Sequence, residues 1–168
     1  FLIGNRITYD KFCSSIQKKV LQKYVKQFLN SKLKEKYAGY GQGGGVVCHP
    51  EPDIKNGPGG LRDYHSALWA TAVRYGCNSL REINEEHVLS REEIESLYHS
   101  VDFSLRVRNE LHYLTEKKID ILTFDTQKQL AANLGYQSSS HSQPVEEFMR
   151  DYYLHATNIY TFSQNLFE

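Results

Sequence analysis

Residues 51–69 read EPDIKNGPGGLRDYHSALW, and within them an irregular segment turns into a helix. Residues 51–63 hold five charges, three glycines and two prolines. From Leu61 to Tyr75, apolar side chains recur at the three- and four-residue spacing of one helix face, and Gly76 follows. Glycine is the residue that most often ends a helix. The segment therefore predicts a helix over 61–75 that begins directly after a constrained, charged loop.

The start of this helix has the properties of an anion-binding site. The first amide groups of a helix have no partner within the helix and carry partial positive charge. Gly57, Gly59 and Gly60 have no Cβ atom, so their backbone can approach a ligand closely. Lys55 and Arg62 would add full positive charges beside them. The pattern permits phosphate binding without identifying the ligand, because it matches neither a P-loop nor a Rossmann turn.

A second interpretation of the same loop is equally compatible with its physics. The acidic residues Glu51, Asp53 and Asp63 lie within a few positions of both cations. The segment would then be a rigid turn in which Lys55 and Arg62 pair with these carboxylates and no ligand binds. Long irregular loops in small domains are functional in some proteins and merely structural in others.

Composition excludes several classes of protein. The chain has 168 residues, which fits one domain, and its 20 basic residues balance its 20 acidic residues. No net field therefore recruits nucleic acid or an acidic membrane. Cys13, Cys48 and Cys77 form no zinc or disulfide pattern, which favours a reducing, cytoplasmic setting. No apolar run approaches the length of about 20 residues that a membrane helix needs.

Helical periodicity continues on both sides of the loop, without a useful strand pattern. Apolar residues recur every four positions from Phe12 to Phe28, which predicts one long helix with Thr8 as its N-cap. The sequence therefore predicts an all-α helical bundle with a glycine-rich loop over 39–60. The expected helices run from Thr8 to about Tyr37, over 61–75, briefly from a capping box at Ser79, from a capping box at Ser90 to about Thr115, from Thr123 to Gly135, and onward from Pro144.

The remaining polar residues do not complete a catalytic set. Arg108 and His112 are four residues apart on an expected helix and share a face. They would form a polar cluster pointing at the loop, or a network that fixes helix orientation, and the network is favoured. The chain contains no Asp-x-Asp pair, no His-Asp doublet and no Gly-x-Ser-x-Gly motif. We therefore expect no catalytic residue and no metal ligand in it.

The segment 51–69 resembles the signature of the bacterial protein-PII uridylyltransferase and uridylyl-removing enzymes, which are related to the glutamine-synthetase adenylyltransferases. Three further blocks resemble the family in the same order: LRVRNELHYL at 105–114, LTFDTQKQLAANLGY at 122–136 and VEEFMRDYYLHA at 145–156. The resemblance covers essentially the whole chain. It points to the helical domain that follows the nucleotidyltransferase domain in this family.

The resemblance implies a larger enzyme that transfers UMP from UTP to a tyrosine of the PII signalling protein. Residues 1–7 would be a linker from the upstream nucleotidyltransferase domain, and 8–168 the helical domain that contacts it. Upstream carboxylates would hold Mg²⁺, so this segment alone would be inactive. An HD-type hydrolase domain and two ligand-sensing domains would follow. Nucleic acid and membranes are not expected partners.

The resemblance also implies roles for the loop residues. Those expected to contact the nucleotide or the acceptor protein are Lys55, Gly57, Gly59, Gly60 and Arg62. Asp63 would orient Arg62 or Arg108, and the full set of supporting residues is Glu51, Asp53, Asp63, Arg108 and His112. The alternative is a regulatory or docking module that binds a partner protein and touches no nucleotide.

Overall fold

The computed structural model describes residues 3–16, 19, 22–40, 45–76, 82, 89–138 and 141–167. Across these residues the chain is helical and forms no strand, apart from an isolated antiparallel bridge between Asp53 and Ile121. This confirms the predicted all-α class. The helices are α1 (Arg6–Ile16), α2 (Val25–Gly39), α3 (Leu61–Tyr75), α5 (Arg91–Thr115), α6 (Phe124–Asn133) and α7 (Pro144–Phe167), with a short 3₁₀ turn, η2 (Gln22–Tyr24), before α2.

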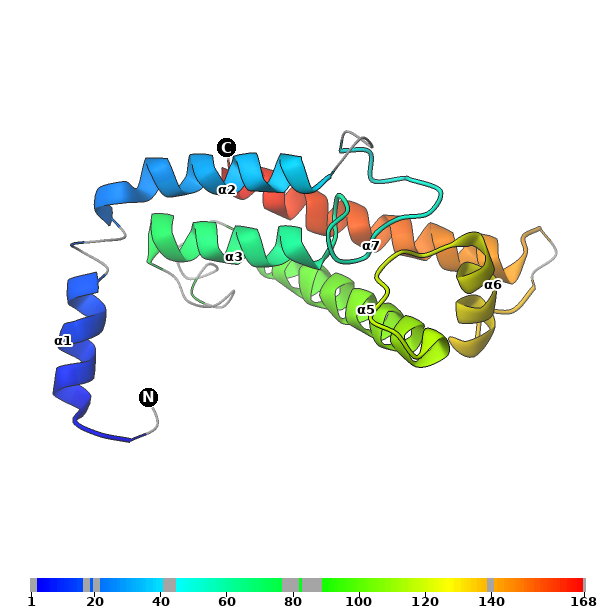
Figure 1. Ribbon diagram of the computed structural model, residues 1–168, viewed down its shortest axis with the longest axis horizontal. Helices are drawn as coiled ribbons and strands as arrows, with labels where there is room; N and C mark the ends of the chain where they lie inside the picture. Colours follow the sequence, from blue (N-terminus) through cyan, green and yellow to red (C-terminus); the bar gives the residue numbers. More distant parts are fainter. Residues whose placement is uncertain are drawn as a thin grey trace.

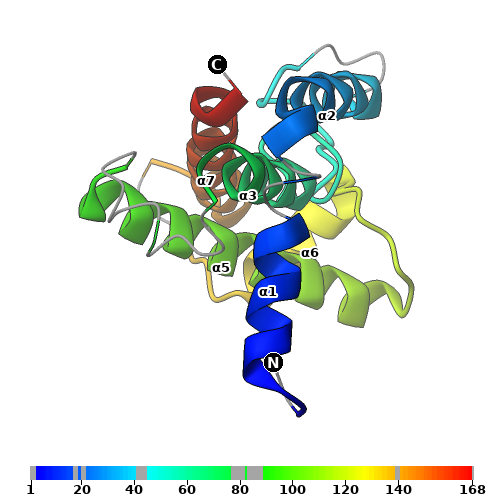
Figure 2. The same cartoon turned by 90° about the vertical axis from the view of Figure 1, so that its left-hand side faces the viewer.

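Helix α7 is the centre of the bundle, and it packs against α3, α5 and α6. Figure 1 shows α2 and α3 side by side over α7, with α6 at the far end from α1. Figure 2 looks along the bundle from the α1 end. Phe148 and Tyr152 of α7 lie in a core with α6 and the second half of α5, whereas Ile159 and Phe162 lie in a second core with α3 and the start of α5. Burial of these side chains holds the helices together.

The N-terminal region departs from the prediction of a single long helix. The chain forms α1 and α2 instead, with the 3₁₀ turn directly before α2. Helix α1 begins at Arg6, and the side chain of Asn5 accepts a hydrogen bond from the amide of Thr8 at 3.0 Å, so Asn5 takes the capping role expected of Thr8. No residue of α1 is buried, and Phe12 is 62% exposed. The apolar spacing is present, but of these two helices α2 packs against α3, whereas no described side chain of α1 is buried.

The other helix ends were predicted correctly where the structure describes them. Gly76 ends α3 with a left-handed φ of 75°, and Ser90 forms both hydrogen bonds of a capping box with Glu93. The Thr123 side chain caps α6, and Pro144 is the first residue of α7. The capping box expected at Ser79 and the glycines at 41–44 lie outside the described residues.

Candidate functional site

The loop over 45–60 lies between α7 and the segment that joins α5 to α6. The Ile54 amide donates to the Asp120 carbonyl at 2.8 Å, and the Leu122 amide donates to the Pro52 carbonyl at 2.9 Å. The side chain of Ile54 is 1% exposed and belongs to the same core as Leu122. A buried anchor and two backbone hydrogen bonds therefore fix the charged part of the loop before it enters α3.

The glycine turn is pressed against α7, which corrects the prediction that its amides face a ligand. Gly59 has a φ of +74°, and a Cβ atom there would lie 2.1 Å from the Ala156 carbonyl oxygen. The Gly59 amide donates to the Asp63 carboxylate at 2.9 Å, and the Gly60 amide donates to the Gly57 carbonyl at 2.9 Å. Glycine is required here because the backbone must pass close to another helix.

The first amides of α3 are also occupied. Leu61 donates to the Ile54 carbonyl at 3.0 Å, and Arg62 donates to the Lys55 carbonyl at 2.9 Å. The loop thus folds back and supplies the acceptors that a bound anion would otherwise supply. A cradle of bare amides, as the sequence suggested, is absent at this helix start.

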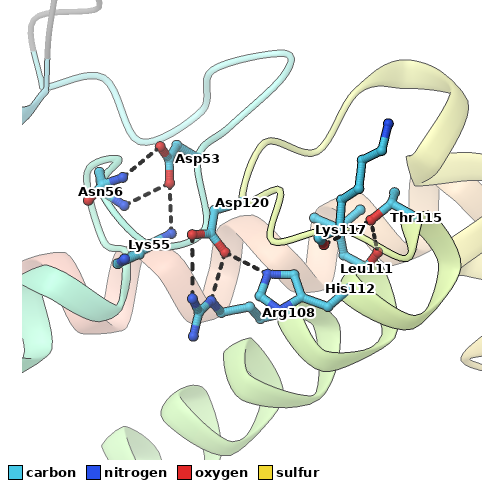
Figure 3. A network of polar contacts seen from close by, with 9 residues as sticks. All are labelled: Asp53, Lys55, Asn56, Arg108, Leu111, His112, Thr115, Lys117 and Asp120. Atoms are coloured by element: carbon cyan, nitrogen blue, oxygen red, sulfur yellow. Dashed lines mark hydrogen bonds and ion pairs between the residues drawn. The ribbon is translucent and has the colours of Figure 1, made fainter.

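The acidic residues of the loop bind backbone groups rather than cations. Glu51 accepts from the Phe124 amide at 2.9 Å, at the start of α6. Asp53 accepts from the amides of Lys55 and Asn56 at 2.9 and 2.8 Å, and from the Asn56 side chain at 3.0 Å (Figure 3). These carboxylates hold the loop in its conformation, and neither forms an ion pair with Lys55 or Arg62.

Asp63 is buried, with 2% of its surface exposed, and it joins three elements. Its carboxylate accepts from the Tyr40 hydroxyl at 2.6 Å and from the Gly59 amide. Lys36 of α2 is 3% exposed and donates to the Ser163 hydroxyl at 2.7 Å. Burial raises the pKa of Asp63 and lowers the pKa of Lys36, and the attraction between the two charges opposes both shifts. The resemblance implied that Asp63 orients Arg62 or Arg108. Its carboxylate binds Tyr40 and Gly59 instead, so it does not take that role.

The side chains of Lys55 and Arg62 form no ion pair with any residue that the structure describes. This finding argues against the rigid-turn interpretation, in which both cations were neutralised by the loop acids. Instead, both border a hollow of about 450 Å³ between α2, α3 and α5. Its lining consists of four cations, one carboxylate, one histidine and three apolar side chains: Lys32, Lys55, Arg62, Arg108, Glu35, His65, Leu61, Trp69 and Leu105. We call it the cationic hollow.

Arg108 is held in the wall of the cationic hollow by Asp120. Its Nε and Nη2 atoms lie 2.7 and 3.4 Å from the two carboxylate oxygens, and His112 Nε2 lies 3.0 Å from Oδ1 (Figure 3). Partial burial acts to raise the pKa of Asp120, but the hydrogen bonds from Arg108 and His112 outweigh it and the pKa is lowered. The Asp120 carbonyl also accepts a hydrogen bond from the Ile54 amide of the loop. The polar network of Arg108, His112 and Asp120 therefore joins helix α5 to the loop.

Sequence analysis missed several residues of this site, among them Asp120, Trp69 and Lys32. Asp120 follows the end of α5, and only the shared face of Arg108 and His112 indicated that a carboxylate partner was needed. Trp69 and Lys32 were not assigned to the site, because the approach of α2 to α3 places them there. Nothing in the sequence around Trp69 or Lys32 indicated that these side chains line the hollow.

The chain is an all-α helical domain, and the cationic, partly apolar hollow beside its glycine turn is the candidate binding site. A sequence profile of the family described as GlnD PII-uridylyltransferase matches residues 27–167. This chain belongs to that family. No solved structure matches the chain.

The curated relatives that match are named bifunctional uridylyltransferase/uridylyl-removing enzyme. Those of Nitrobacter winogradskyi and Bradyrhizobium diazoefficiens are each 33% identical over 95% of this chain, and one from a Psychrobacter species is 36% identical over 98% of it. The matched region spans 17–18% of the length of these relatives. The family resemblance seen in the sequence is thereby confirmed.

Two further properties concern only the described part of the chain. No group of three His, Cys, Asp or Glu side chains there is placed to hold a metal ion, and the expectation that Mg²⁺ is bound upstream stays a prediction. None of the helices in that part combines the length and apolar character needed to cross a membrane. The cytoplasmic location likewise stays a prediction.

Proposed function

We propose that this chain is the nucleotide- and acceptor-binding helical domain of a uridylyltransferase that transfers UMP from UTP to a PII-type regulatory protein. The family and the names of its relatives support the reaction. The observation that carries the proposal is the cationic hollow, in which Lys55 and Arg62 form no ion pair with a described residue. Mg²⁺ and its carboxylate ligands belong, in this proposal, to another part of the enzyme.

The charge distribution of the hollow suits a triphosphate. UMP transfer breaks the bond between the α- and β-phosphates and releases diphosphate, so negative charge accumulates on the leaving group. Fixed cations beside that group stabilise the transition state without having to reorganise. Lys55 and Arg62 are free to contact phosphate oxygens. Arg108 supplies a third charge, whose position is set by Asp120.

The test uses the full-length protein that contains this chain, with Lys55→Gln and Arg62→Gln as separate variants. Lys118→Gln is the matched control, because Lys118 is exposed and does not line the cationic hollow. We expect each hollow variant to lower kcat/KM for UTP by roughly 10- to 100-fold, the effect of one or two charge-assisted hydrogen bonds, and the control to leave it unchanged.

Retention of both turnover and UTP affinity in the two hollow variants would overturn the proposal. If the hollow variants keep their UTP affinity but bind the PII-type acceptor more weakly, the result would favour the alternative of a protein-docking module. Measuring UTP binding and acceptor binding on the same variants separates the two functions.

A further inference from the structure

The wall of the cationic hollow contains an aromatic ring that a purely phosphate-binding site does not need. Trp69 is 49% exposed and lies on α3, seven residues after Arg62. Seven residues are close to two helical turns, so both side chains lie on one face, about 10.5 Å apart along the axis. Leu61 and Leu105 extend the apolar surface beside the ring.

The face of the Trp69 ring already binds a cation of the same protein. Lys32 Nζ lies 5.0 Å from the ring centroid, over the ring, while Glu35 holds the same ammonium group at 2.6 Å. Cation–π attraction of this kind draws planar and cationic groups to the face of an indole ring. The ring is therefore outside the core clusters and about half exposed, and the side chain of Lys32 from α2 covers part of its face.

We infer that Trp69 is the platform on which the nucleobase of the bound nucleotide stacks, while Lys55, Arg62 and Arg108 receive its phosphates. This inference rests on the proposed function and adds a ligand subsite to it. A nucleoside triphosphate carries a planar base and a polyanion joined by a ribose. The hollow presents the aromatic face of Trp69 and a cluster of cations that includes Arg62, two turns earlier on the same helix. Inorganic phosphate or diphosphate would fill only the cationic end.

The magnitudes favour the base over Lys32 as the occupant of the ring face. The Lys32 side chain is 22% exposed, and a cation–π contact of this kind is worth about two- to thirtyfold in an equilibrium constant. Stacking of a base on an aromatic side chain is worth about 5- to 150-fold. The base therefore displaces Lys32 from the ring, and Glu35 keeps the displaced ammonium group paired.

Stacking on Trp69 also has a definite consequence for selectivity. Every nucleobase has a π-face, so a stacking platform strengthens binding without distinguishing one base from another. His65 also lines the hollow, four residues before Trp69 on α3. Trp69 contributes affinity for nucleotides over inorganic anions, and the choice of uracil is made elsewhere in the enzyme.

The test compares two probes, Mg²⁺–UTP and Mg²⁺–tripolyphosphate, by calorimetric titration of the full-length protein. The variants are Trp69→Leu, which keeps an apolar side chain, and Trp69→Tyr, which keeps an aromatic ring. Tyr113→Leu is the control, because Tyr113 is 79% exposed on α5 and does not line the cationic hollow. Circular dichroism of each variant verifies the fold.

We expect Trp69→Leu to weaken UTP about 5- to 150-fold and tripolyphosphate less than twofold, with Trp69→Tyr recovering most of the loss and Tyr113→Leu changing neither. Equal UTP affinity in Trp69→Leu and the native protein would overturn the inference, as would an equal loss for both probes. If tripolyphosphate binding does not depend on Lys55 or Arg62, the proposed function itself fails. If it does depend on them while Trp69→Leu has no effect on UTP, only the stacking subsite fails.

Discussion

Arg108 and Asp120 lie twelve residues apart, on opposite sides of the turn that ends α5, and their side chains are joined by two hydrogen bonds of 2.7 and 3.4 Å. The same carboxylate binds His112, and the backbone of Asp120 binds the loop that carries Lys55. One acidic residue therefore links helix α5, the glycine-rich loop and the wall of the cationic hollow. Lys55 and Arg62, in contrast, have no such partner among the described residues.

Asp120→Asn should lower the free energy of unfolding by about 1.5–3 kcal/mol at neutral pH, because it removes a partly buried, charge-assisted interaction. The pKa of Asp120 is lowered in the folded protein, so its contribution is present above the unfolded value of about 3.9 and is lost as the pH falls through the folded value. Chemical denaturation at several pH values measures this. The control is Asp102→Asn, whose exposed pair with Arg106 is worth less than about 1 kcal/mol. Equal losses in both variants would contradict the prediction.

Lys55→Gln and Arg62→Gln should leave the free energy of unfolding within about 0.5 kcal/mol of the native value, because neither side chain forms an ion pair with a described residue. The same variants are expected to lose UTP affinity, so function and stability separate at these positions. Arg108→Gln is the contrasting variant. It removes the arginine that pairs with Asp120 and leaves only His112, so it should destabilise the protein. Unfolding measured in urea would contradict this scheme if Lys55→Gln or Arg62→Gln destabilised the protein as much as Arg108→Gln.

Gly59→Ala should destabilise the protein more than Gly135→Ala does. Both glycines have positive φ, and alanine at such a position costs about 1–2 kcal/mol of backbone strain. A Cβ atom at Gly59 would additionally lie 2.1 Å from the Ala156 carbonyl oxygen, whereas at Gly135 it would meet nothing within 4 Å. The difference between the two variants in thermal and denaturant unfolding isolates the clash with α7. Identical losses would show that the turn is not held against that helix.

Lys36→Met should lower the free energy of unfolding by about 1–3 kcal/mol near pH 8, because it removes the buried hydrogen bond to Ser163 and the charge that opposes the desolvation of the Asp63 carboxylate. The pKa of Asp63, already raised by burial, rises further in this variant. A carboxyl with a raised pKa destabilises the fold when it is ionised, so the loss should shrink as the pH falls and Asp63 takes up a proton. Lys34→Met, at an exposed position of α2, is the control. A loss independent of pH would exclude this role of Lys36.

Most of the helical architecture could be predicted from the sequence, because caps and periodicity act over a few residues. Ser90, Thr123 and Pro144 start their helices as expected. The prediction was wrong over the N-terminal stripe, where the same periodicity did not produce one helix. Amphipathic spacing favours a continuous helix only when another element covers the apolar face, and α1 has no buried residue.

The residues of the candidate site were only partly predictable. The sequence indicated that Lys55, Arg62 and Arg108 act together, and the structure places all three on the cationic hollow. It also suggested that Gly59 and Gly60 present free amides, whereas these amides bind within the loop. The local sequence is compatible with free amides at Gly59 and Gly60 and with amides bonded inside the loop. Which of the two forms depends on how closely α7 approaches the turn.

The sequence by itself determined the family, the positions of most helices and the identity of the charged loop, since motifs and caps depend on order along the chain. Only the tertiary structure decided which charges are neutralised. Glu51 binds a backbone amide 73 residues away, and Asp63 is enclosed by α2 and the glycine turn. Packing brings such distant groups into hydrogen-bonding range and removes them from water. Among the described residues, packing leaves Lys55 and Arg62 without an ion pair, and this is a property of the fold that no local pattern could specify.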